Sequence, residues 1–145
     1  MSSEAQIVVF AMVSLVFFTI SLFATDEDWL ASVGCTGVLV AYWALNTILW
    51  MTGIVEDWSL PSDILFALGS AALAWNLRKS WLVALVGLFG INLTLDGLHI
   101  AGLIGYGNWA EAGNVTFVLQ LGTASFPGLV RVTRSLIGGM RRRVA

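Results

Sequence analysis

Three polar side chains recur at helical spacing within an otherwise apolar stretch, residues 81–106. Asn92, Asp96 and His99 are four and three residues apart, so they share one face of an α-helix. A carboxylate and an imidazole three residues apart can touch, and histidine exchanges protons near neutral pH. The spacing favours two interpretations, which are a proton relay or ion site and a set of hydrogen bonds between helices.

A second polar stripe lies in the next apolar stretch, residues 112–130. Its members are Thr116, Gln120, Thr123 and Pro127. Gln120 should lie at about the same depth in the membrane as Asn92, and Asn46 at about the same depth as Asp96. A lipid-facing aspartate costs about 2.5–3.5 kcal/mol, so we expect Asp96 to face the bundle interior. The predicted interior cluster is Asn46, Asn92, Asp96, His99 and Gln120.

The other side of the 81–106 helix carries a row of small residues. They are Gly90, Thr94, Gly97, Ala101 and Gly105. Such rows let helix backbones approach closely in lipid. With a polar face on one side and this row on the other, the helix should have protein neighbours on both sides. We therefore predict that it lies in the middle of the bundle and packs through this row.

Composition identifies the elements that carry these residues as membrane helices. Of the 145 residues, 58% are hydrophobic and 11% are charged, whereas soluble domains carry about 25% charged residues. A helix needs about 20 apolar residues to cross the hydrocarbon core. We predict an all-α, polytopic transmembrane helical bundle with about five spans and short loops, forming one membrane domain over residues 1–145. The predicted spans are 5–24, 29–55, 60–77, 81–106 and 112–130, followed by a basic tail, 131–145.

The basic residues predict the orientation of the bundle. The seven are Arg78, Lys79, Arg131, Arg134, Arg141, Arg142 and Arg143. Five spans place all of them on one side, which the positive-inside rule makes cytoplasmic, so the N-terminus should be outside on a retained first helix. The acidic residues 26–28 fit this side less well. We expect a bacterial-type inner membrane or a virus-derived membrane, with the five tail arginines contacting anionic lipid headgroups.

Helix ends carry their own signals. The Asx–Trp pairs Asp28–Trp29, Asp57–Trp58 and Asn108–Trp109 stand at three predicted helix starts. Asp and Asn are good N-caps, and tryptophan suits the membrane–water interface. Late in the last span, Pro127 removes a backbone hydrogen bond. A kink is predicted there, and the freed carbonyl group should find another donor.

Enzymatic activity is not expected. The chain has one His and one Cys, and we find no phosphate-binding loop, metal-ligand spacing or nucleophile motif. A lone His is weak support for a haem or chlorin ligand, so no cofactor is predicted. The net charge of −2 gives no reason to expect nucleic acid. The expected partners are the lipid bilayer and either further copies of the chain or other membrane subunits.

Three functions remain as hypotheses. The leading one is a structural or accessory subunit that acts through helix–helix association in an oligomer or a larger membrane complex. The second is a pore former, because small size and a basic C-terminal tail look like those of phage holins, although holins usually have fewer spans; another viral membrane protein belongs with this alternative. The third is a small proton- or ion-coupled transporter that uses Asp96 and His99.

Overall fold

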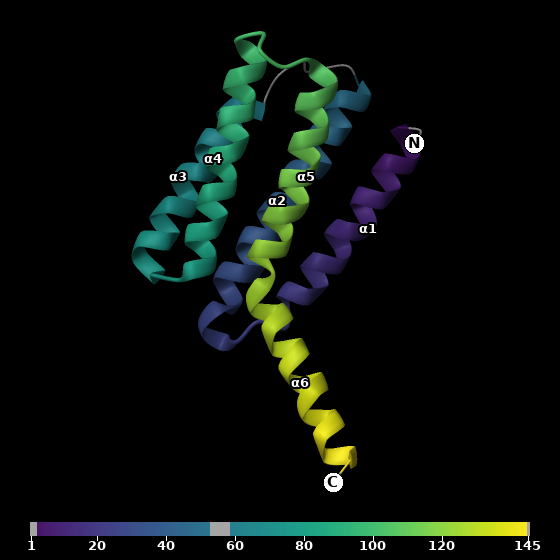
Figure 1. Cartoon of the computed structure of the whole chain (residues 1–145), viewed down its shortest axis with the longest axis vertical. Coiled ribbons are helices and arrows are strands. Elements are labelled where there is room, and N and C mark those ends of the chain that lie inside the picture. The colour runs from purple at the N-terminus through teal and green to yellow at the C-terminus, as the bar shows by residue number, and fades with distance from the viewer. Residues whose placement is uncertain (1–2, 53–58, 145) are drawn as a thin grey trace.

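The computed structural model describes residues 3–52 and 59–144, and every regular element in them is an α-helix. The helices are α1 (Ser3–Ser21), α2 (Asp26–Thr52), α3 (Ser59–Leu77), α4 (Ser80–Ile100), α5 (Tyr106–Ala124) and α6 (Phe126–Val144). The first five form a bundle, and α6 projects from one end of it (Figure 1). The predicted fold class, an all-helical membrane bundle, is confirmed.

Fewer helices than the predicted five have the length and apolarity of a membrane span. Within the described residues α2, α3 and α4 have them, and a fourth span results if α5 and α6 count as one broken span. The first predicted span is short because its apolar helix, Ala5–Ser21, gives way to a turn at Leu22. The fifth is interrupted because the chain bends by 59° between α5 and α6.

The distribution of side chains fits a lipid environment. Ser32, Thr36 and Gln120 are among the most deeply buried residues, whereas Leu30 and Trp75 are 78% and 85% exposed. Soluble monomers rarely expose large contiguous apolar surfaces. In lipid these side chains contact acyl chains, while buried hydroxyl and amide groups connect helices. The protein is therefore located in a membrane.

Most helices pack on their neighbours in the chain, with α5 at the centre. α3 packs closely on α4, α4 on α5, and α1 on α2. Because α5 also contacts α1 and α2, it is α5, and not α4 as predicted, that has protein on most sides (Figure 1). The backbones of α2 and α3 make few close approaches, and these helices touch through the rings of Tyr42 and Phe66, 5.1 Å apart. The apolar core comprises Leu39, Trp81, Leu82, Leu85, Phe89, Phe117, Leu121 and Ala124.

Two short turns set the ends of α4. The turn before it contains Arg78, whose φ of 52° is left-handed, and the turn after it contains Gly102 with a φ of 71°. Glycine adopts that conformation readily. The predicted helix 81–106 is therefore too long: α4 ends at Ile100, and Ala101 and Gly105 of the predicted small-residue row lie beyond it.

Two of the predicted N-caps lie inside the first turn of their helices. α2 begins at Asp26, two residues before Asp28. α5 begins at Tyr106 with Gly105 at the N-cap, so Asn108 is already helical. A negative charge is favourable within the first turn because of the helix dipole, which fits Asp28. The pattern thus marked the right regions but the wrong cap residues. The third pair, Asp57–Trp58, lies outside the described residues.

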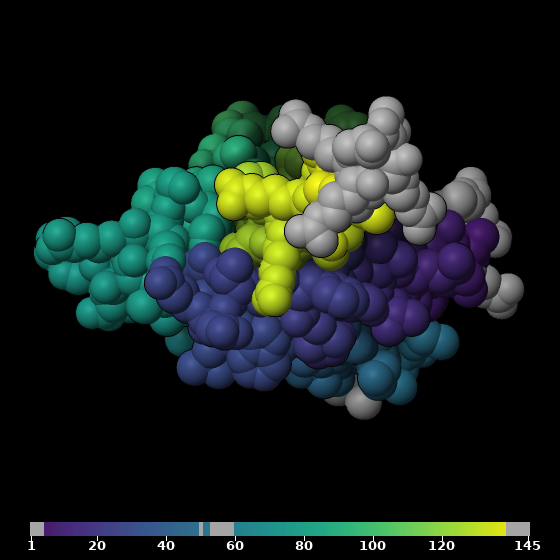
Figure 2. Space-filling view, turned by 90° about the horizontal axis from the view of Figure 1, so that it is seen from below, coloured from purple at the N-terminus to yellow at the C-terminus, as the bar shows by residue number. Residues whose placement is uncertain are grey.

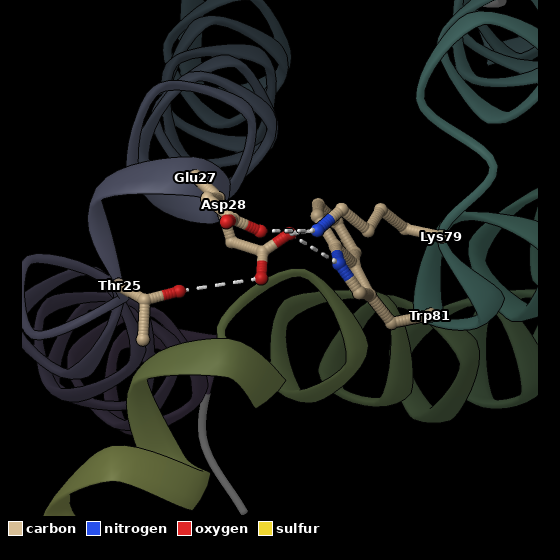
Figure 3. Close-up of polar contacts among 5 residues, drawn as sticks. All are labelled: Thr25, Glu27, Asp28, Lys79 and Trp81. Atoms are coloured by element: carbon tan, nitrogen blue, oxygen red, sulfur yellow. Dashed lines mark hydrogen bonds and ion pairs between the residues drawn. The ribbon is translucent and has the colours of Figure 1, made fainter.

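Asp28 instead ties the start of α2 to the α3–α4 turn (Figure 3). Its Oδ1 atom lies 3.2 Å from Nζ of Lys79 and accepts a 3.5 Å hydrogen bond from Nε1 of Trp81. The hydroxyl group of Thr25 donates a 3.4 Å hydrogen bond to Oδ2 of Asp28, and Glu27 forms a 3.5 Å ion pair with Lys79. The acidic segment that fitted the predicted charge distribution less well thus supplies two partners of Lys79.

The bend after α5 begins at Ser125, two residues before the predicted kink at Pro127. Ser32 of α2 donates a 2.6 Å hydrogen bond to the carbonyl oxygen of Ala124, where the helix is interrupted. Gly128 lies against the carbonyl oxygen of Ile20 so closely that a Cβ atom would collide with it. Seen from this end, α6 lies between the α3–α4 hairpin and α1 (Figure 2).

The described basic residues gather at one end of the bundle. Nη1 of Arg131 donates a 3.0 Å hydrogen bond to the carbonyl oxygen of Ala24. Lys79 forms an ion pair with Asp28, which is four residues after Ala24. The start of α1 lies at the opposite end (Figure 1). Arg134 is exposed, and the side chains of residues 141–143 lie outside the described part. Contact of the tail with lipid headgroups stays a prediction.

Candidate functional site

A cavity of ≈ 220 Å³ lies among α2, α3, α4 and α5, near the α4–α5 turn. The backbones of α2 and α3 do not pack closely beside it, and these two helices meet there through side chains that include the rings of Tyr42 and Phe66. Its lining combines two carboxylates, four amides and four aromatic rings. These are Asp63 and Asp96; Asn46, Asn92, Asn114 and Gln120; Tyr42, Trp43, Trp109 and Phe117.

Asp63 and Asp96 face this cavity from adjacent helices, and each is 5% exposed. Asp63 stands four residues into α3 and Asp96 four residues before the end of α4, so each is roughly 6 Å from that end of the bundle at 1.5 Å per residue. Asn92, one turn before Asp96, hydrogen-bonds to Asp63 and so joins the two helices. The cavity therefore lies in the half of the bundle that is away from the basic residues.

Charge balance is the main electrostatic property of the cavity. Two carboxylates in a low-dielectric interior are not both ionised without a compensating charge. Among the described residues, no Lys or Arg lines the cavity. A proton or a bound cation is then the available source of positive charge.

Trp109 closes the cavity at the α4–α5 turn. Its indole Nε1 donates a 2.8 Å hydrogen bond to Oδ1 of Asp96. The ring of His99 stacks on that of Trp109, with centroids 4.9 Å apart and planes inclined by 16°. Nδ1 of His99 lies 3.2 Å from the carbonyl oxygen of Ile104. His99 is thus placed behind Trp109 and supports the wall without lining the cavity.

The α2 side of the cavity is fixed by a hydroxyl pair. Ser62 donates a 2.8 Å hydrogen bond to the phenol oxygen of Tyr42, and Asn46, one turn further along α2, also hydrogen-bonds to Tyr42. This pair holds α2 against the start of α3, directly before Asp63. The amide and phenol groups consequently face the same space as the two carboxylates.

Two amide atoms in the lining have no hydrogen-bond partner in the described structure. They are Nε2 of Gln120 and Oδ1 of Asn92. Gln120 is only 2% exposed. A buried amide without a partner is uncommon, because desolvation is not offset. These atoms are therefore available to a molecule inside the cavity.

The predicted interior cluster is largely brought together. Asn46, Asn92, Asp96 and Gln120 all line the cavity, and His99 stands one ring behind it. Asp96 faces the interior as expected, but its 2.8 Å hydrogen bond comes from Trp109, which was not among the predicted partners. Trp109 was assigned to the membrane interface because indole side chains commonly lie there.

The small-residue row of α4 does not pack within the chain. Gly90, Thr94 and Gly97 are exposed, and a Cβ atom at either glycine would meet no atom within 4 Å. Ala101 and Gly105 are exposed in the turn. The deduction that α4 packs through this row is therefore wrong within the single chain, because the buried side of α4 is the one that carries Leu82, Leu85, Phe89 and Asp96.

Asp63 is the functional candidate that sequence reasoning missed. It lies three residues after the predicted start of a span, where an acidic residue ordinarily belongs to the interface. The signal that could have found it is the one that marked Asp96, a carboxylate within an apolar stretch. Comparison with known proteins adds nothing to this list, since no family model, curated protein or solved structure matches the chain. Function is therefore inferred from the cavity itself.

Proposed function

We propose that this protein is a small membrane transporter coupled to protons or cations. The observation that carries the proposal is the pair of buried carboxylates, Asp63 and Asp96, facing one polar cavity. Ionisable residues inside membrane proteins are rare, face the bundle interior and mark ion or proton pathways. A purely structural role would need hydrogen-bonding groups, but it would not need two acids side by side.

The orientation follows the distribution of basic residues. Since the described basic side chains gather at one end of the bundle, that end is assigned to the cytoplasm by the positive-inside rule. The N-terminus is then outside, and the C-terminus is cytoplasmic, in a bacterial-type inner membrane or a virus-derived one. In this orientation the cavity lies in the outer half of the bundle.

Proton flux into liposomes tests the proposal. Purified protein is reconstituted with a trapped pH-sensitive dye, and the rate of internal pH change is followed after an imposed gradient. We expect Asp63→Asn and Asp96→Asn each to lower the rate at least tenfold. Glu111→Gln, an exposed acid in α5, is the matched control and should keep the wild-type rate.

The same liposomes separate the transporter from a pore. Calcein trapped inside is too large and too charged for a 220 Å³ cavity, so a transporter should retain it. Release of calcein by wild type and both Asp variants alike would mean that the protein forms holin-like pores. Equal proton flux in wild type and both variants would also reject the carboxylate mechanism.

A second candidate is the structural or accessory subunit. The specific observation in its favour is the exposed row of Gly90, Thr94 and Gly97 on α4, which has the small-xxx-small character of helix contacts in lipid. Gly97→Leu should leave the monomer folded but lower the proportion of oligomer or complex in mild detergent. Unchanged mass by light scattering in this variant would remove the support for this role.

A further inference from the structure

We infer that the cavity binds a small hydroxylated organic ammonium ion, of which choline and ethanolamine are the simplest examples. This inference rests on the proposed function for its cation, and it adds the chemical class of the ligand. Three properties of the cavity carry it. They are its charge, its aromatic walls and its unpartnered amides.

The charge of the lining selects a cation. Asp63 and Asp96 contribute carboxylates at 5% exposure each, and the described lining contains no basic side chain. A buried charge is stable only when it is paired. A ligand carrying a single positive charge, together with one proton shared by the carboxylates, would leave the cavity electrically neutral.

The walls favour an organic cation over a metal ion. Trp43 and Phe117 stack with centroids 6.4 Å apart, and Tyr42 and Trp109 complete an aromatic lining. Aromatic faces attract alkylated ammonium groups, which keep little hydration. A divalent metal would instead be expected among three or more acidic, His or Cys ligands, and the described residues contain no such group.

The volume sets the size of the ligand. A protein cavity of about 150 Å³ holds benzene, which has six heavy atoms. At ≈ 220 Å³ the present cavity admits a molecule of roughly six to nine heavy atoms by the same ratio. Choline falls within that range, and ethanolamine fits with a water molecule beside it.

The two unpartnered amide atoms are the reason to expect a hydroxyl group on the ligand. Nε2 of Gln120 is a donor without an acceptor, in a side chain that is 2% exposed. Oδ1 of Asn92 is an acceptor without a donor. A hydroxyl group can accept from the first or donate to the second. A ligand with an ammonium group and a hydroxyl group therefore matches both the acids and the amides.

A groove supplies the route to this cavity. It has a volume of ≈ 450 Å³, runs between α1 and the α2–α5 pair, and shares Trp43, Asn46, Ala110 and Asn114 with the cavity. Gln6, Thr47 and Tyr106 add polar groups to it. Figure 1 shows α1 diverging from α5 toward its N-terminal end, and the lining residues Gln6 and Ile7 place the groove at that end. The ligand would then enter from the end of the bundle that lacks basic residues.

Binding is tested by isothermal titration of the full chain in detergent. The probes are choline and its uncharged isostere 3,3-dimethylbutan-1-ol, which has the same shape and hydroxyl group. We expect choline to bind at least tenfold more tightly than the alcohol. Asp63→Asn and Asp96→Asn should each weaken choline binding at least tenfold and leave the alcohol unchanged, and retained alcohol binding shows that the variant is folded.

Two further variants test the aromatic wall and the contact with the hydroxyl group. Trp43→Leu should weaken choline binding at least fivefold, whereas Trp75→Leu, at a side chain that is 85% exposed, should not. The wild type should bind choline more tightly than tetramethylammonium, which lacks the hydroxyl group. Gln120→Leu should abolish this preference, because the hydroxyl group of choline loses its donor. If choline preference survives this substitution unchanged, the assignment of the hydroxyl group is wrong.

The outcomes distinguish this inference from the proposed function. Absence of choline binding with intact, Asp-dependent proton flux would overturn the inference and keep the transporter. Equal binding of choline and the alcohol would also overturn it. Choline binding without any proton or cation flux would support the inferred site and reject transport as the function.

Discussion

The indole nitrogen of Trp109 donates a 2.8 Å hydrogen bond to Oδ1 of Asp96 across the α4–α5 turn. Asp96 stands one turn before the end of α4, and Trp109 stands in the first turn of α5. The ring of His99 stacks on the indole ring system of Trp109. One interaction thus closes the turn, positions a carboxylate and forms a wall of the cavity.

Replacing Trp109 should show the strength of this link. Trp109→Phe keeps an aromatic ring but removes the donor to Asp96, and losing a hydrogen bond to a buried carboxyl group costs about 1–3 kcal/mol. The melting temperature in detergent should fall accordingly. Trp75→Phe, at an exposed position, is the control and should melt as wild type does; equal melting of all three proteins would contradict the prediction.

Ser32→Ala should destabilise the bend between α5 and α6. Ser32 is fully buried and supplies the 2.6 Å hydrogen bond to the carbonyl oxygen of Ala124. Without it, a carbonyl group in an apolar interior loses its donor, at about 1–3 kcal/mol. The free energy of unfolding can be measured by titration with sodium dodecyl sulfate. Ser135→Ala, at an exposed site in α6, should change it little, and a loss no larger for Ser32→Ala would argue against this role.

Gly128→Ala should disturb the packing of α6 on α1. The added methyl group would collide with the carbonyl oxygen of Ile20, a backbone atom that has no alternative rotamer. Overpacking of this kind typically costs about 1–3 kcal/mol. Gly138→Ala is the matched control, because a Cβ atom there meets nothing within 4 Å, and alanine in a helix is more stable than glycine by about 1 kcal/mol. Thermal unfolding of the two variants should therefore shift in opposite directions.

The interactions of Lys79 should make the stability of the folded state depend on pH in the alkaline range. The hydrogen bond to Asp28, reinforced by the charges of Asp28 and Glu27, raises the pKa of the Lys79 ammonium group above its ordinary value. The folded state therefore binds this proton more tightly than the unfolded state does, and its stabilising effect is complete below the unfolded pKa and is lost as pH rises through the folded pKa.

The measurement is a melting series between about pH 8 and pH 12, across the range where lysine titrates. The melting temperature of wild type should fall toward that of Lys79→Gln as the pH rises. Because Lys79 lies at the surface, the difference should also shrink in high salt. A constant difference over the whole pH range would show that the ammonium charge is not involved.

The sequence identified the start and the interior of α4 correctly and its C-terminal end incorrectly. Asp96 could be found because a carboxylate in a long apolar stretch has few alternatives to an interior position. Trp109 could not, since its bond to Asp96 requires α5 to begin at Tyr106, several residues before the predicted span. Asp63 was missed because it stands close to the end of a span, where composition alone does not separate an interior acid from an interfacial one.

Contacts between distant segments were also beyond sequence reasoning. The contact of Gly128 with Ile20 and the hydrogen bond from Ser32 to Ala124 join residues far apart in the chain. Spacing along one helix gives no information about which backbone will approach it. The proline indicated that the last span would bend, but the serine that satisfies the interrupted helix could only be seen in the structure.

The attachment of α6 to α1 has a consequence for how the protein is made. The contact of Gly128 with Ile20 and the bond from Arg131 to Ala24 join α6 to the C-terminal end of α1 and to the turn that follows it. During synthesis chains fold from the N-terminus, yet the C-terminal end of α1 acquires these contacts only after α6 has left the ribosome. The C-terminal end of α1 must therefore wait in the membrane, incompletely packed, until α6 (Phe126–Val144) has been synthesised. Ribosome-bound chains stopped before Phe126 should leave Ile20 accessible to crosslinking, whereas chains that include α6 should protect it.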